Sequence, residues 1–154
     1  MTAKAARTNP PRRSSSAEEV AAVAMMRTAD ALGRPVAALL KREGVSTAQY
    51  NVLRILRGTP DGLLCRGIGE RMISRDPDIT RLLDRLEERG LIARCRENPD
   101  RRHVMTRITP AGLAVLARLD EPVAALHRRL LGHLGPERLR ALTGLLEACR
   151  TPPG

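Results

Sequence analysis

The chain has 154 residues, which is enough for one domain with its own core and too few for two domains of typical size. Its 27 lysines and arginines against 17 aspartates and glutamates give a formal net charge of +10, which favours a polyanionic partner. No apolar run approaches the roughly 18 residues of a membrane span and no signal peptide is visible, so we expect a cytoplasmic protein without a membrane partner.

Residues 1–16 combine basic residues with prolines and serines, and they contain no acidic residue. This composition predicts a disordered basic arm, which either touches DNA or only keeps the chain soluble. Residues 17–43 then place apolar side chains at helical spacing. They predict a long helix with a kink at residues 33–35, because Pro35 cannot donate a backbone hydrogen bond.

Residues 46–49 have the form of a capping box, in which a serine and a glutamine side chain satisfy free backbone donors of a first helical turn. They predict a helix over residues 47–57, which Gly58 is suited to end. Two leucines at residues 63–64 can then pair as a very short strand. Residues 65–73 predict a brief helix, which its two glycines weaken by roughly 1 kcal/mol each.

The next helix begins sharply, with Asp76 as its N-cap and Pro77 at its first position, and it runs to Arg89 before Gly90 ends it. Its apolar residues fall on one stripe. That stripe consists of Ile79, Leu82, Leu83 and Leu86. One side of this helix is therefore suited to pack against a core, and the charged residues of the other side face outward.

Residues 91–109 change to an alternation of side chains with a period of two, which predicts two strands. Residues 97–100 supply the turn between them, so the strands form a hairpin. The threonine-proline pair after the hairpin begins another helix, with a bend at Pro122. A last helix begins at residues 135–136.

This order of elements is that of a winged helix-turn-helix. We therefore predict a mostly α-helical fold with a small β-hairpin as its wing. In such a fold the third helix of the motif enters the major groove, which is about 12 Å wide, while nearby positive groups hold the phosphates. The only aromatic residue is Tyr50, whereas proteins that bind single strands usually stack bases on aromatic rings. Duplex DNA is the expected partner.

The candidate contacts gather at the start of the recognition helix, which usually lies deepest in the groove, and at the hairpin tip. Arg81 is the strongest candidate for a base or phosphate contact, and the alternative is a solvated charge paired with Asp84 or Glu88. An arginine at the tip suits the narrow minor groove, and the alternative is a charged turn without a function. The predicted DNA-binding residues are Arg75, Asp78, Thr80, Arg81, Arg85, Arg101 and Arg102, with Asp100 as the brace of the wing.

Several motifs together indicate a family. Residues 46–50 (STAQY), 78–91 (DITRLLDRLEERGL), 100–102 (DRR) and 108–112 (ITPAG) closely resemble motifs of the MarR family of bacterial transcriptional regulators, in the same order and at the same spacing. The resemblance covers about residues 30–149.

The resemblance implies a regulator, most simply a repressor, that acts as a homodimer on a pseudo-palindromic operator. Two-fold symmetry would put the half-sites about 10 bp apart, or a multiple of that. It implies a single domain over residues 17–150, with dimerisation helices at 17–45 and 109–150 and the winged helix-turn-helix lobe at 46–108. It also implies release from DNA by a small anionic effector in a crevice between those helices and the lobe, without indicating which residues line the crevice.

Two alternatives to a ligand-controlled DNA-binding regulator stay open. A thiol-based redox sensor is one, because Cys65 lies near a helix start and Cys95 lies between two arginines, settings that lower a thiol pKa. A winged-helix module that binds a protein partner without binding DNA is the other. The three cysteines, with Cys149, suggest neither a disulfide framework nor a zinc site. Neither a catalytic set nor a cofactor motif is visible, so we expect no enzyme activity, metal or cofactor.

Overall fold

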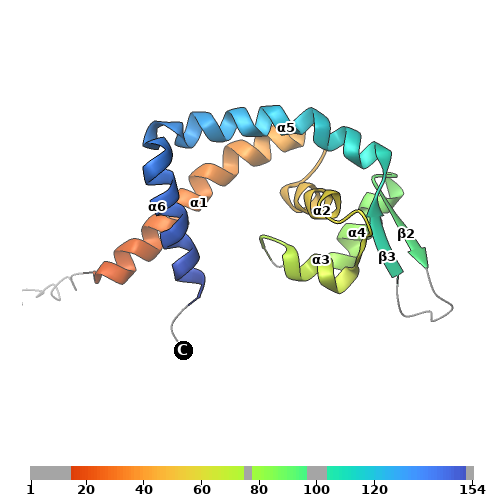
Figure 1. The fold of residues 1–154 in the computed structure, drawn as a ribbon, viewed down its shortest axis with the longest axis horizontal. Helices are drawn as coiled ribbons and strands as arrows, with labels where there is room; N and C mark the ends of the chain where they lie inside the picture. The colour runs from red at the N-terminus through yellow and green to blue at the C-terminus, as the bar shows by residue number, and fades with distance from the viewer. Residues whose placement is uncertain (1–14, 75–77, 97–103, 152–154) are drawn as a thin grey trace, which may run out of the picture.

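The computed structural model describes residues 15–74, 78–96 and 104–151. Three long helices form one part of the molecule, and three short helices with a small sheet form a lobe at its side (Figure 1). The elements in chain order are α1 (Ala17–Arg42), α2 (Thr47–Arg57), β1 (Leu63–Leu64), α3 (Cys65–Arg71), α4 (Ile79–Glu88), β2 (Ile92–Arg96), β3 (Val104–Ile108), α5 (Pro110–Leu131), the 3₁₀ turn η1 (Gly132–Leu134) and α6 (Gly135–Arg150). The predicted mostly α-helical fold with a hairpin wing is confirmed. Over these described ranges, no helix is long and apolar enough to span a membrane.

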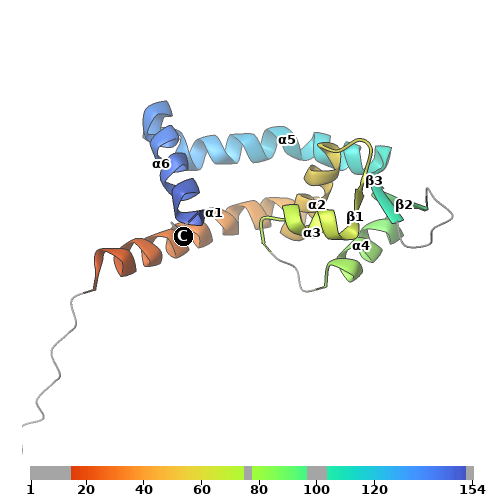
Figure 2. The same cartoon turned by 60° about the horizontal axis from the view of Figure 1, so that its bottom comes forward.

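Helices α1, α5 and α6 form the elongated part of the molecule (Figures 1 and 2). Ser16 and Glu19 make a capping box at the start of α1, and the helix continues through Pro35 without a break. Helix α5 likewise continues through Pro122. Helix α6 follows the turn η1, which the sequence did not predict, and runs crosswise to α5 from the end of that helix (Figures 1 and 2).

The lobe begins with the predicted capping box. Ser46 Oγ accepts a hydrogen bond from Gln49 N at 3.1 Å, while Gln49 Oε1 accepts one from Ser46 N at 3.0 Å. The predicted helix over residues 47–57 is confirmed, with Gly58 as its C-cap. Helix α3 ends at Arg71, two residues before the predicted end, and no side chain caps its start at Leu64.

The sheet has the strand order β1-β3-β2, and both pairs are antiparallel. The predicted hairpin and the predicted short strand are thus both confirmed. Ile92 lies opposite Ile108 and Leu63 opposite Thr106, so β3 joins the short strand to the wing. Strand β2 contributes the buried side chain of Ile92 to the core, next to the end of α4.

One apolar core holds the lobe against α1 and α5. It takes side chains from the end of α1, from α2, α3 and α4, from the sheet and from the first half of α5. Its fully buried members include Leu40, Leu53, Leu56, Ile68, Leu83, Leu86, Leu116 and Leu119. Burying a leucine contributes roughly 1.5 to 3 kcal/mol, so this cluster sets how the lobe sits on α5.

The junction between the hairpin and α5 is unusually close. Thr109 caps α5 by accepting a hydrogen bond from Gly112 N at 3.1 Å, and its hydroxyl donates to the carbonyl oxygen of Gly90 at 2.6 Å. A methyl group placed on Gly112 would lie 2.7 Å from Cγ1 of Ile108 and still closer to the carbonyl oxygen of Leu91. The lack of a side chain at residue 112 therefore lets α5 begin directly against the hairpin.

Candidate nucleic-acid interface

Helix α4 has one buried side and one exposed side, as the apolar stripe predicts. Leu82, Leu83 and Leu86 are buried in the core. Thr80, Arg81 and Arg85 are exposed, and the side chain of Arg81 is 71% accessible. The structure thus brings three of the predicted DNA-binding residues together on the outer side of one helix.

The start of α4 differs from the prediction. The helix begins at Ile79, and its N-cap is Asp78 rather than Asp76. The carboxylate of Asp78 accepts a hydrogen bond from Arg81 N at 3.3 Å, and this satisfies a donor that the first turn leaves free. Asp76 and Pro77 lie outside the described residues.

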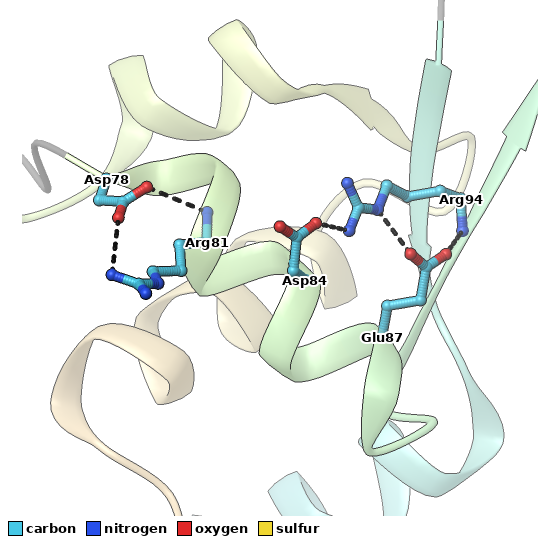
Figure 3. Close-up of polar contacts among 5 residues, drawn as sticks. All are labelled: Asp78, Arg81, Asp84, Glu87 and Arg94. Carbon is cyan, nitrogen blue, oxygen red and sulfur yellow. Dashed lines mark hydrogen bonds and ion pairs between the residues drawn. The ribbon is translucent and has the colours of Figure 1, made fainter.

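Arg81 pairs with a different residue from those considered in the sequence. Its Nη1 lies 3.9 Å from Oδ2 of Asp78, one turn earlier (Figure 3). Asp84 faces Arg94 instead. At this length and exposure the pair between Arg81 and Asp78 is weak, so the guanidinium can leave it for a stronger anion such as a phosphate.

Arg94 on β2 bridges two acidic residues of α4 (Figure 3). Its Nη2 donates to Asp84, its Nε donates to Oε2 of Glu87 at 2.8 Å, and its backbone N donates to Oε1 of Glu87 at 3.1 Å. The hydrogen bond to Asp84 raises the pKa of Arg94, against the opposing effect of burial. Arg94 is not among the residues predicted from the sequence. Two acids one turn apart on the helix, followed by an arginine in the next strand, were the available signal.

Two further contacts position α4 and were also missed. Asn51 on α2 accepts a hydrogen bond at Oδ1 from the backbone N of Ile73 at 2.8 Å, which holds the segment after α3. Arg89 after the end of α4 donates from Nη1 to the carbonyl oxygen of Gly44 at 2.7 Å, between α1 and α2. Both bonds join residues far apart in sequence, so no local pattern reveals them.

Four of the predicted residues lie outside the described residues. They are Arg75 before α4, and Asp100, Arg101 and Arg102 at the predicted hairpin tip. The strands β2 and β3 on both sides of that tip are described, and they lie next to α4 at the outer end of the lobe (Figure 1).

In the part of the chain that the structure describes, the cysteines and acidic residues form no further candidate site. Cys95 and Cys149 are exposed and Cys65 is half-buried, and all three are free thiols. Among residues 15–74, 78–96 and 104–151, no group of three or more histidines, cysteines or carboxylates is arranged to hold a metal ion.

Comparison with known proteins decides the family. A model of the MarR family matches residues 43–103, the segment that contains α2, α3, α4 and the start of the hairpin. A MarR transcription factor of known structure from Planctomyces limnophilus is 39% identical, with a TM-score of 0.67, and the match covers 88% of this chain and 98% of that one. The chain belongs to the MarR family. It is accordingly related to transcriptional regulators along nearly its whole length.

Other relatives are regulators by name. TtmR from Methylorubrum extorquens is 34% identical over 97 residues. The match covers 63% of this chain and 49% of TtmR, so the chain spans only about half the length of that relative. The homoprotocatechuate degradative operon repressor of Escherichia coli is 27% identical over 109 residues, covering 71% of this chain and 73% of the repressor. The PcaV regulator from Streptomyces coelicolor, solved in complex with its natural ligand, is 26% identical with a TM-score of 0.68 and 97% coverage of both chains.

Proposed function

We propose that this protein is a transcriptional repressor that binds a specific double-stranded DNA operator as a homodimer. The observation that carries the proposal is the outer side of α4, where Thr80, Arg81 and Arg85 are exposed on a helix that its leucines anchor in the core. A helix anchored in this way can lie in the major groove without losing its packing. The repressor name of the Escherichia coli relative supports repression over activation.

In this proposal the predicted residues divide into two sets. Arg75, Thr80, Arg81 and Arg85 contact the major groove and its phosphates, while Asp78 caps the helix and orients Arg81. Arg101 and Arg102 contact the minor groove beyond the helix, with Asp100 as their brace.

The second protomer of the dimer is proposed because α1 and α6 each have an exposed apolar face. On α1 these are Val20, Val23, Met25 and Met26, with Met26 64% exposed, and on α6 they are Leu142, Leu145 and Leu146, with Leu145 67% exposed. Helices with such faces need a partner to bury them. A two-fold dimer through α1, α5 and α6 would place two α4 helices about one DNA turn apart, or about 10 bp.

A small carboxylate effector is part of the same proposal. A groove of about 480 Å³ lies between α1 and α5, with Pro35, Leu39, Pro122 and Leu126 on its walls. Arg42 and Arg129 also line it, and neither forms an ion pair with any of the described residues. Two guanidiniums beside apolar walls suit an apolar anion. The relative PcaV, which has a natural ligand, supports an effector here.

The test of DNA binding is selection of duplexes from a random pool at physiological salt, followed by affinity measurements on the selected sequence. Arg81→Ala should weaken specific binding by roughly 1 to 3 kcal/mol and relax the sequence preference at one position. The matched control is Arg34→Ala, which removes an equally exposed arginine from α1, where its partner is Asp30. No enriched sequence for the wild type would favour the protein-interaction alternative, and unchanged binding by Arg81→Ala would contradict the site.

The dimer and the thiols need separate measurements. Leu145→Glu should halve the mass measured by light scattering, because it places a charge in the apolar face of α6. A monomeric wild type would contradict the dimer. A loss of operator affinity on treatment with peroxide, reversed by thiol reductant, would favour the redox alternative.

A further inference from the structure

We propose that Arg94 is a positioning residue that fixes the β2–β3 hairpin against α4, so that the recognition helix and the wing meet DNA as one rigid unit. This inference rests on the proposed function. It assigns to Arg94 a role that differs from DNA contact, since its side chain is only 23% exposed and points at α4 (Figure 3).

The geometry ties residue 94 to the helix at three points. The side chain reaches Asp84 with one nitrogen and Glu87 with another, and these acids lie one turn apart on α4. The backbone N of the same residue donates to Glu87 at 3.1 Å. Main chain and side chain of one strand residue are therefore both held by the helix, which fixes the strand's distance and rotation about its own axis.

Among the described residues, the other polar links between the end of α4 and the hairpin lie at the turn itself, where the Thr109 hydroxyl donates to the carbonyl oxygen of Gly90 at 2.6 Å. Leu91 N donates to the carbonyl oxygen of Leu86 at 3.0 Å, directly at the turn between helix and strand. A contact at the turn acts as a pivot and sets no angle by itself. Arg94 contacts α4 further along the strand, so it is placed to set the angle at which the hairpin leaves the helix.

Arg94 also neutralises charge at the proposed interface. The side chains of Asp84 and Glu87 are 47% and 41% exposed on a helix that is to approach phosphates. Without Arg94 both carboxylates would repel the DNA. A planar guanidinium can hold both at once, whereas the single ammonium of a lysine cannot match the two directions.

These two roles, positioning and neutralising, can be separated with the full-length chain. Arg94→Met keeps the apolar stem, Arg94→Lys keeps the charge, and the triple variant Arg94→Met, Asp84→Asn, Glu87→Gln removes the unpaired acids as well. Each is measured for affinity to the selected duplex and by hydroxyl-radical footprinting, with Arg34→Met as control. Thermal unfolding and circular dichroism verify that each variant is folded.

Arg94→Met should weaken binding roughly tenfold and lose protection of the flanking minor groove, while the central protection from α4 remains. Arg94→Lys should recover part of the affinity but not the flanking protection. The triple variant should bind more tightly than Arg94→Met and still lack that protection. If Arg94→Met does not fold, the pair Asp84→Asn, Glu87→Gln is expected to show the same loss at the flanks.

Three results overturn the inference. The first is an unchanged footprint in Arg94→Met, or in the double variant Asp84→Asn, Glu87→Gln if Arg94→Met does not fold. This result removes the positioning role and leaves the proposed function intact. Full recovery of affinity and flanking protection in the triple variant makes Arg94 a counter-charge only. A wild type that protects no duplex overturns the proposed function and this inference with it.

Discussion

Arg57 and Asp120 join the lobe formed by α2, α3, α4 and the sheet to the long helix α5. Nη1 of Arg57, at the end of α2, donates to both carboxylate oxygens of Asp120, at 2.9 and 2.8 Å. This hydrogen bond lowers the pKa of Asp120 and raises the pKa of Arg57, and in both cases burial acts the other way. The pair thus links the end of α2 in the lobe directly to α5.

Asp120→Asn should lower the free energy of unfolding by no more than about 1 kcal/mol, because both side chains are more than a third exposed and water screens the pair. Because the pKa of Asp120 is lowered on folding, its contribution is complete above the ordinary aspartate pKa of roughly 4 and is lost as pH falls below it. Denaturant unfolding of wild type and variant between pH 7 and pH 3 measures this.

The control for that series is Asp61→Asn, which removes an exposed carboxylate that forms no ion pair with a described residue. The difference between wild type and Asp120→Asn should shrink toward low pH after subtraction of the control. A difference that grows as the pH falls would contradict the assigned direction.

Thr109→Val should destabilise the protein by roughly 1 to 2 kcal/mol, because an N-cap is lost and the carbonyl of Gly90 loses its hydroxyl partner. Thr109→Ser keeps the hydroxyl and should remain within about 0.5 kcal/mol of the wild type. Thermal unfolding of the three proteins makes the comparison. An unchanged stability of Thr109→Val would contradict the role of the hydroxyl, and a loss in Thr109→Ser as large as that in Thr109→Val would show that the methyl group contributes as much as the hydroxyl.

The elements that the sequence predicted well are those with local causes. The capping box of Ser46 and Gln49 involves residues three apart, and the alternation along the hairpin needs only its own residues. The prediction of Asp76 as the N-cap of α4 was wrong, and Asp78 is the cap. The two aspartates flank the same proline, and either suits an N-cap by residue type. A tertiary contact also lies ahead of this helix, where Asn51 on α2 holds the backbone N of Ile73 after α3, and no local pattern shows it.

The site was predictable in part for the same reason. The exposed row with Arg81 follows from the apolar stripe of α4, which is visible as a spacing. For Arg94 the sequence offers only a weak signal, because the two acids and the arginine are visible as a spacing but their contact depends on the angle between β2 and α4. Arg89 and Asn51 likewise act across 45 and 22 residues of sequence.

Gly112→Ala should destabilise the protein by at least roughly 1 to 3 kcal/mol. The added methyl group would clash with the carbonyl oxygen of Leu91 and with Ile108, and the backbone would have to shift to make room for it. Gly69→Ala is the matched control in a helix, because nothing lies within 4 Å of the added atom. The control should be neutral or slightly stabilising, by up to about 1 kcal/mol. Chemical unfolding of both variants decides it, and a stable Gly112→Ala would mean that α5 can shift away from the hairpin.

Asn51→Leu should weaken operator binding several-fold while it lowers the free energy of unfolding by only about 1 kcal/mol, the usual net value of one hydrogen bond. The leucine has nearly the same size but cannot accept from Ile73 N, so the segment before α4 loses its tie to α2. Asn51→Asp keeps an acceptor and should retain the stability of the wild type. Affinity on the selected duplex and thermal unfolding are measured on the same preparations. Because the side chain of Ile73 is 85% exposed, little packing holds this segment once the hydrogen bond is gone. Wild-type affinity in Asn51→Leu would show that the leucines of α4 position the start of the helix without this bond.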